Sequence, residues 1–210
     1  MAPFDPYVSD TDHGPTLWSE AIQDAANATE AFERAKGLVQ SINSVMFHTT
    51  ESRLIEIDSI IEVKGGGRPS KHIASVAKIE SRSYVAGVGQ AINTKNEIIE
   101  EEPAPSKQQK WLKAAEDSEL LSDLLTHGFH RRGWYEIYKA IEVLEFLYGG
   151  EKGLVQFAGE YGKKIKDLKH TANFYHRHAR GEFKKPKSPV ELADAQKLLT
   201  KMIRRAFDKT

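Results

Sequence analysis

The first regular pattern of apolar and polar positions begins at Thr16. Apolar or small residues recur every three or four positions, the period of an amphipathic helix, and Thr16 or Ser19 is suited to cap its start. The residues before it hold three prolines and a glycine, which predicts an irregular arm over residues 1–15. We therefore predict one long helix with this inner seam: Trp18, Ile22, Ala25, Thr29, Phe32, Val39 and Ile42.

The period changes to two after about residue 53. Within residues 55–63 the odd positions are mostly apolar and several even ones are charged, which is typical of a half-buried strand. Residues 73–79 and 84–92 are two further predicted strands, and the simplest arrangement of the three is an antiparallel meander. Such a sheet has an apolar face to cover, so residues 16–99 are predicted to form the long helix packed over a three-stranded antiparallel sheet.

A helical pattern follows an acidic, proline-bearing stretch at residues 100–106, which is predicted to be a linker. One helix is expected from Ser106 to about Thr126. The apolar run at residues 134–147 predicts a well-buried helix that ends at Gly149 and Gly150.

The last helix is expected to begin with Ser188 at the cap, followed by Pro189 and by Glu191 three residues on. Its predicted inner positions are Leu192, Ala195, Leu199, Met202 and Ala206. The predicted fold class is therefore α+β: an N-terminal long helix over a small antiparallel β-meander, followed by an all-α C-terminal bundle at residues 107–207.

Composition narrows the chemistry. The 210-residue chain contains no cysteine, which excludes disulfides, thiolate metal sites and cysteine nucleophiles. No run of residues approaches a membrane span, and the start lacks the pattern of a signal peptide, so we expect a cytoplasmic protein without membrane contact. No sequence motif points to a cofactor or a metal, and none is expected.

The net charge of zero hides an asymmetry between the two ends. Residues 1–62 carry 11 acidic and 3 basic residues, whereas residues 160–210 carry 14 basic and 6 acidic ones. Two interpretations stay open: the acidic end neutralises the basic end, within one chain or between copies, or the basic end meets nucleic acid.

The most distinctive segment is residues 163–180. At 100° per residue its apolar positions fall on one side of a helix: Ile165, Leu168, Ala172, Tyr175 and Ala179. The opposite side is predicted to carry a polar stripe, joined by the outer face of the last helix, as the surface for nucleic acid or a partner: Lys166, His170, Asn173, Arg177, Arg180, Lys197, Lys201 and Arg204. A solvated basic face without a ligand is the open alternative.

The histidines raise the question of catalysis. His176 and His178 diverge on a helix, and His127 with His130 lacks a third ligand of fixed spacing, so neither pair predicts a metal site. An acid–base site that cleaves RNA is chemically feasible with His170, Arg177 and His178. These residue types resemble those of the helical nucleases called HEPN, although the spacing departs from the Arg-x4-6-His pattern of that class.

The helical half resembles a widespread family of uncharacterised bacterial helical domains. The resemblance covers about residues 107–207 and is carried by an Arg/His cluster, Pro189 and these residues: Gly133-Trp134, Tyr138-Lys139 with Glu142, Gly149-Gly150-Glu151, Leu154-Val155 and Thr171-Ala172-Asn173. Phe157-Ala-Gly159 stands where the family has a Gly-Trp pair. The resemblance implies a recurring helical module and no particular reaction.

Two functional hypotheses follow. The first is a non-enzymatic binding and assembly module that associates with itself or with a protein partner and contacts nucleic acid through its basic C-terminal helices. The second is a HEPN-like helical ribonuclease that uses the His/Arg site.

Overall fold

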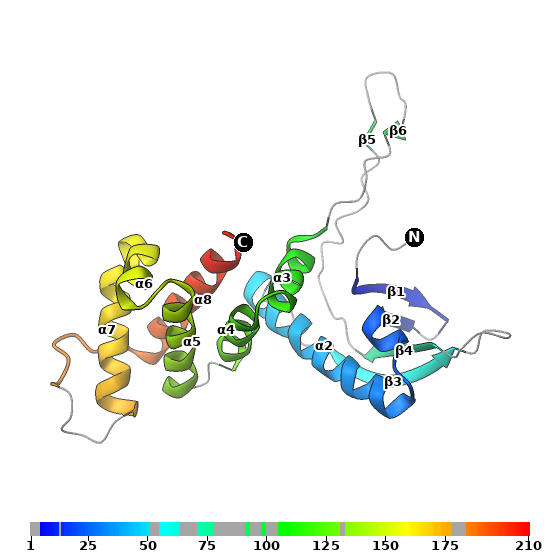
Figure 1. Cartoon of the computed structure of the whole chain (residues 1–210), viewed down its shortest axis with the longest axis horizontal. Helices are drawn as coiled ribbons and strands as arrows, with labels where there is room; N and C mark the ends of the chain where they lie inside the picture. Colours follow the sequence, from blue (N-terminus) through cyan, green and yellow to red (C-terminus); the bar gives the residue numbers. More distant parts are fainter. Residues whose placement is uncertain are drawn as a thin grey trace. The chain divides into compact units, whose positions relative to one another are not determined.

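The computed structural model in Figure 1 combines helices with antiparallel strands. The structure describes residues 5–12, 14–50, 55–63, 71–77, 91–92, 98–99, 105–130, 133–177 and 184–210. The chain divides into two compact units. The sheet unit contains Met1–Met46 and Thr50–Lys110, and the helical unit contains Phe47–Thr49 and Trp111–Thr210.

The chain begins with strands, not with the predicted helix. β1 (Tyr7–Thr11) and β2 (Gly14–Trp18) form an antiparallel hairpin where an irregular arm was expected. Tyr7 lies opposite Trp18, their rings stack with centroids 6.0 Å apart, and the Trp18 indole N–H donates to Ser9 at 2.8 Å. Cross-strand aromatic pairs of this kind stabilise a hairpin. The prolines misled the prediction, because Pro15 is accommodated within β2.

The main sheet has the strand order β1-β2-β4-β3 and is antiparallel throughout. β3 (Glu56–Val63) and β4 (Lys71–Ala77) confirm two of the predicted strands. The predicted third strand at residues 84–92 lies outside the described residues except for β5 (Ala91–Ile92), which pairs with β6 (Ile98–Ile99) in a separate sheet. Besides β3, the neighbour of β4 in the main sheet is β2, a strand that the meander prediction missed.

The strict alternation expected in β3 does not hold along its whole length. The register with β4 shifts between Ile57 and Ser59. An extra residue at such a bulge moves the following side chains to the other face of the sheet. Ile57 and Ile60, three positions apart, consequently both pack against the core of this unit.

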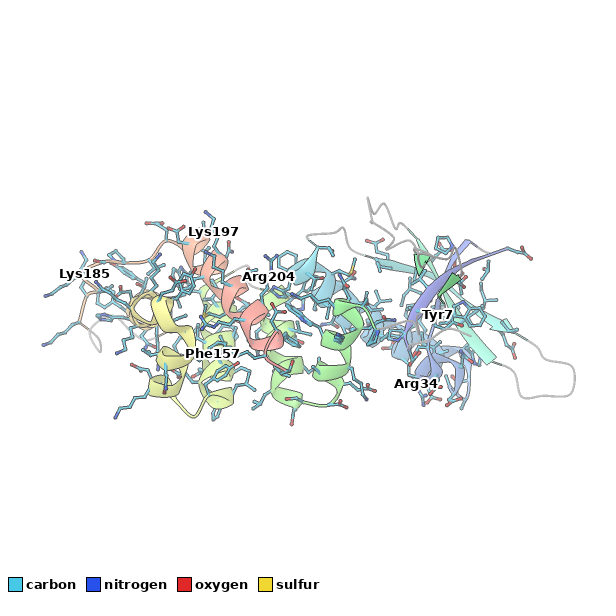
Figure 2. All side chains as sticks on the ribbon, turned by 90° about the horizontal axis from the view of Figure 1, so that it is seen from above. Tyr7, Arg34, Phe157, Lys185, Lys197 and Arg204 are labelled. Atoms are coloured by element: carbon cyan, nitrogen blue, oxygen red, sulfur yellow. The ribbon has the colours of Figure 1, made fainter. Side chains whose placement is uncertain are left out.

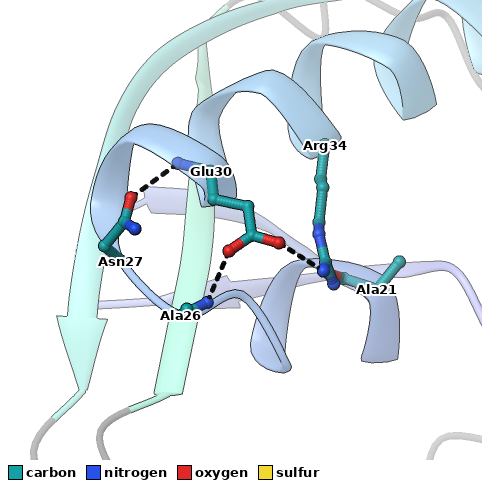
Figure 3. Close-up of polar contacts among 5 residues, drawn as sticks. All are labelled: Ala21, Ala26, Asn27, Glu30 and Arg34. Carbon is teal, nitrogen blue, oxygen red and sulfur yellow. Dashed lines mark hydrogen bonds and ion pairs between the residues drawn. The ribbon is translucent and has the colours of Figure 1, made fainter.

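The predicted single helix from Thr16 to Ile42 is also wrong, because the chain turns between α1 (Glu20–Gln23) and α2 (Ala28–Thr49). Figure 3 shows the polar contacts that begin α2. The side chain of Asn27 accepts from the N–H of Glu30 at 2.9 Å, and the Glu30 carboxylate accepts from the N–H of Ala26 at 2.9 Å. This reciprocal arrangement resembles a capping box and starts a new helix.

Arg34 completes this cluster and links α2 to α1. Its guanidinium donates to the Glu30 carboxylate at 2.5 Å and to the carbonyl oxygen of Ala21 at 2.8 Å (Figure 3). The hydrogen bond from Ala26 and then the contact with Arg34 hold the pKa of Glu30 below its ordinary value.

One face of the sheet is covered by α2, as the sequence predicted. The buried cluster of this unit joins α2 to β2 and β4 through small and branched side chains. Phe32 and Thr29 were expected on the inner side but are exposed, and the inner seam contains Ala31 and Ala35 instead. The cluster consists of Leu17, Ile22, Ala25, Ala31, Ala35, Val39, Ala74 and Val76.

The helical unit is built around α5 (Trp134–Leu147), which contacts α4, α6, α7 and α8. Ile137, Ile141 and Leu144 of α5 are fully enclosed, so the apolar run does form a buried helix. The remaining elements are α3 (Lys107–Glu116), α4 (Glu119–Phe129), α6 (Glu151–Ala158), η1 (Gly159–Tyr161), α7 (Gly162–Ala172), η2 (Asn173–Arg177) and α8 (Leu192–Phe207).

Three boundaries of this half can be compared with the sequence. Gly149 and Gly150 end α5 as expected, with φ of 75° and 97°, values that favour glycine. The helix predicted from Ser106 to Thr126 is two helices, because Ser118 caps a second one by accepting from the N–H of Leu121. α8 starts at Leu192 with Glu191 at its cap, so the predicted cap at Ser188 is wrong.

α8 uses the inner face that its period predicted. Ala195, Leu199, Met202 and Ala206 are buried, and the ring of Phe207 stacks on Trp111 with centroids 4.6 Å apart. Among the described residues, no helix is long and apolar enough to cross a membrane.

Candidate nucleic-acid interface

The predicted polar stripe begins on α7, whose opposite side is buried as expected. Ile165, Leu168 and Ala172 are enclosed. Tyr175 was expected beside them but is 37% exposed. The physical reason is the change from α-helix to the wider π-helix η2 at Asn173, which alters the angle per residue and rotates the following side chains.

The structure places only part of the stripe. Lys166 is exposed, and His170 lies one helical turn further along the same face, half-buried. Asn173 starts η2, and its side-chain oxygen is enclosed with no hydrogen-bond partner among the described residues. The side chain of Arg177, together with His178, Ala179 and Arg180, lies outside what the structure describes.

The segment between α7 and α8 is tied to α7 by two adjacent residues. The Nε2 atom of His170 lies 2.6 Å from the carbonyl oxygen of Lys184, and since a carbonyl only accepts, Nε2 is the donor. Thr171 is buried; its hydroxyl donates to the carbonyl oxygen of Asp167 at 2.8 Å and accepts from the N–H of Val190 at 3.0 Å. The described segment 184–190 is thus fixed against α7 at both of its ends.

This attachment ties a segment with three exposed lysines to the helix that carries two more. Lys163 and Lys166 lie on the same face of α7 as His170, by the 100° step of a helix, and the tied segment adds three more. We call the five the basic row: Lys163, Lys166, Lys184, Lys185 and Lys187. All are exposed, and none forms an ion pair with another residue in the part of the chain that the structure describes. Figure 2 labels Lys185 on the segment between α7 and α8.

Four members of the basic row were not among the predicted contact residues. The prediction relied on the period of a helix, so it selected residues of α7 and α8 and none of the segment between them. The sequence Lys184-Lys185-Pro186-Lys187 was a visible signal of positive charge. The sequence does not indicate the hydrogen bond between Thr171 and Val190, because the two residues are 19 positions apart and no local pattern relates them.

The predicted basic positions on α8 differ in their roles (Figure 2). The side chain of Lys197 is 77% exposed and approaches Asp194 at only 3.8 Å. The Lys201 amine lies over the ring of Tyr161, 5.2 Å from its centroid. Arg204 is half-buried and donates to the carbonyl oxygen of His48 at 2.5 Å, so its side chain serves the packing of the unit.

Lys169 links three helices behind the basic row. Its amine donates to Glu145 of α5 at 2.6 Å and to Glu151 of α6 at 3.0 Å. Burial alone would lower the pKa of Lys169, but the hydrogen bonds and charges of the two carboxylates outweigh it and raise the pKa above its ordinary value. Lys169 therefore stays positively charged, and its two ion pairs hold α7 against α5 and α6.

The histidine pair on α4 offers no further ligands. His127 lies within α4, and His130 caps its end. In the described part of the chain, no group of three or more histidine, cysteine or acidic side chains is arranged to hold a metal ion.

Comparison with known proteins does not identify a family for this chain. No family model matches the chain, and neither a curated protein nor a solved structure matches it. The resemblance of residues 107–207 to a bacterial helical domain family therefore stays a prediction.

Proposed function

We propose that this chain is a non-enzymatic binding module whose basic row holds the phosphate backbone of a nucleic acid. The observation that carries the proposal is the attachment of segment 184–190 to α7 by His170 and Thr171. It holds a segment with three exposed lysines against the helix that carries two more, before any ligand arrives. Preorganised charges lose less entropy on binding than charges on a free segment.

The lysine amines of the basic row suit the phosphates of a nucleic acid better than the carboxylates of a partner protein. Lysine amines are compact charges that contact phosphate oxygens without reading base edges. Each contact releases counterions from the nucleic acid, so the affinity depends steeply on salt. The exposed ring of Tyr175, which follows α7, offers a surface on which a base can stack. We therefore expect single-stranded nucleic acid to bind at least as tightly as a duplex.

The ribonuclease alternative has less support in the described geometry. A general base needs a ring nitrogen within reach of the 2′-hydroxyl proton. Nε2 of His170 is engaged with the backbone of Lys184, where it holds the segment in place. In our proposal His170 therefore has a positioning role, because it holds the segment that carries the lysines.

The test is fluorescence anisotropy with a labelled single-stranded RNA and a labelled duplex DNA of mixed sequence. Lys166→Glu and Lys185→Glu are each expected to lower the affinity by roughly tenfold or more, the value of one phosphate contact near 0.1 M salt. Lys152→Glu is the matched control: it changes the net charge equally at an exposed position on α6, where a carboxylate near the helix start is tolerated. The control is expected to bind like the unmodified chain.

Two results would overturn the proposal. One is the absence of binding at low salt, or an equal loss of affinity in all three variants. The other is cleavage of the RNA by the unmodified chain that His170→Ala abolishes while binding persists, which would establish the catalytic alternative.

A further inference from the structure

The outward side of α5 carries two large aromatic side chains that the helical unit leaves in solvent. Tyr135 is 66% exposed and Phe146 is 77% exposed, the two highest values among the large hydrophobic side chains that the structure describes. They are eleven residues apart, so they point in nearly the same direction, about 16 Å from each other along the helix. An exposed aromatic pair on one helix face is typical of an interaction surface.

Two opposite charges lie between the aromatic residues. Lys139 and Glu142 form an ion pair of 2.8 Å on the same face of α5. The face therefore reads Tyr135, Lys139, Glu142 and Phe146, with spacings of four, three and four residues. We call these four residues the α5 stripe.

The α5 stripe is symmetric about its midpoint. An aromatic residue stands at each end, and a base and an acid stand at equal distances from the centre between Ala140 and Ile141. If a second α5 is laid antiparallel across this centre, Lys139 faces Glu142 of the second copy, and Tyr135 faces Phe146 of the second copy. A two-fold axis demands this kind of self-complementarity from a single surface.

We propose that two copies of this chain associate through antiparallel packing of their α5 stripes. The charges favour a second copy over a strongly acidic or strongly basic partner, because the stripe carries one charge of each sign. The opposite side of α5 is fixed in the core by Ile137, Ile141 and Leu144, so the helix that carries the stripe is held in place before association. This association is independent of nucleic-acid binding.

The size of the stripe sets the strength of the dimer. Each aromatic side chain can bury roughly 150–250 Å², so four partly exposed rings contribute on the order of 500 Å². Stable interfaces bury about 1,200–2,000 Å² in total. The dimer is therefore expected to be weak and reversible, with a dissociation constant in the micromolar range or above.

Sedimentation equilibrium of the full chain over a wide concentration range tests the association. The unmodified chain is expected to pass from monomer to dimer as its concentration rises, and Tyr135→Ser with Phe146→Ser is expected to stay monomeric. Phe32→Ser is the matched control, since Phe32 is an exposed aromatic residue on α2 of the sheet unit. A chain that stays monomeric at all concentrations would overturn the proposal, as would equal dimerisation of all variants.

Charge exchange and crosslinking test the antiparallel geometry. Lys139→Glu alone places like charges opposite each other and is expected to weaken the dimer, whereas Lys139→Glu with Glu142→Lys restores it. The natural chain has no cysteine, so introduced thiols report without background. A mixture of the Tyr135→Cys and Phe146→Cys variants is expected to form the mixed disulfide. Disulfides only between identical variants, or no recovery in the exchanged variant, would refute antiparallel pairing.

Discussion

Two surfaces of the helical unit differ in how their charge is arranged. The basic row carries five lysines of one sign, and no described acidic residue pairs with them. The α5 stripe carries one lysine and one glutamate between two aromatic rings. A surface of one sign repels its own copy and attracts a polyanion, whereas a balanced surface with apolar ends can meet itself. The two charge patterns are therefore the basis on which we propose two different partners, a nucleic acid and a second copy of the chain.

The two surfaces also differ in what holds them. The α5 stripe belongs to a helix whose other side is buried in the core. Three of the five lysines of the basic row belong to a segment held by single hydrogen bonds with His170 and Thr171. The loss of one such hydrogen bond leaves its partner unsatisfied and frees that end of the segment. The basic row is thus the more fragile surface.

Salt concentration gives the largest expected contrast between the surfaces. Under the proposed function up to five lysines contact phosphates, so raising the salt from about 50 to about 200 mM is expected to weaken nucleic-acid binding by roughly 10²–10³-fold. Self-association through the α5 stripe is expected to change by less than about threefold, because exposed ion pairs contribute little. Anisotropy and sedimentation in the same buffers check this. Similar salt dependence for both processes would remove the distinction.

Loss of the Thr171 hydroxyl is the next largest expected effect. Thr171→Val keeps the shape but leaves the N–H of Val190 without its acceptor, at an expected loss of about 1–3 kcal/mol in the free energy of unfolding. Thr171→Ser keeps the hydroxyl and serves as the control. The valine variant is expected to bind nucleic acid several-fold more weakly and to dimerise normally, as urea unfolding, anisotropy and sedimentation will show. Unchanged nucleic-acid affinity would mean that the attachment does not organise the basic row.

A smaller effect is expected at Lys169, which connects the helices of both surfaces. Its pKa is raised above the ordinary value of 10.5 in the folded chain. Its bridges to Glu145 and Glu151 therefore contribute fully at neutral pH, and the contribution is lost as the pH rises through the folded pKa. The loss is expected to be roughly 1 kcal/mol in the free energy of unfolding. Lys169→Met, followed by urea unfolding between neutral and alkaline pH, is expected to lack this loss.

Glu30 in the sheet unit is expected to have the opposite pH dependence, with stability lost at acidic pH. The pKa of Glu30 is lowered from 4.5 by its contacts with Ala26 and Arg34. The contribution of these contacts to stability is therefore present above pH 4.5 and is lost as the pH falls through the folded pKa. Glu30→Gln is expected to flatten the acidic limb only. A change in the alkaline limb would show that the two effects are not separate.

The period of apolar positions predicted some elements of the fold and missed others. The periods of two and 3.6 correctly predicted β3, β4, α5 and the inner face of α8. They failed where a capping residue starts a new helix within an otherwise regular apolar pattern. Asn27 begins α2 and Ser118 begins α4, yet apolar spacing continues across both breaks. A cap outweighs a continuing period, because it satisfies backbone N–H groups that a helix start leaves free.

The sequence by itself determined the α+β class, the buried helices and the excess of positive charge near the C-terminus, because these depend on neighbouring residues and composition. The tertiary structure decided which basic residues form a surface. Arg204 is drawn to the carbonyl oxygen of His48, 156 residues away, whereas Lys184 is held beside α7 by His170. Contacts across such separations depend on how the elements pack, and no local pattern of apolar and polar positions encodes them.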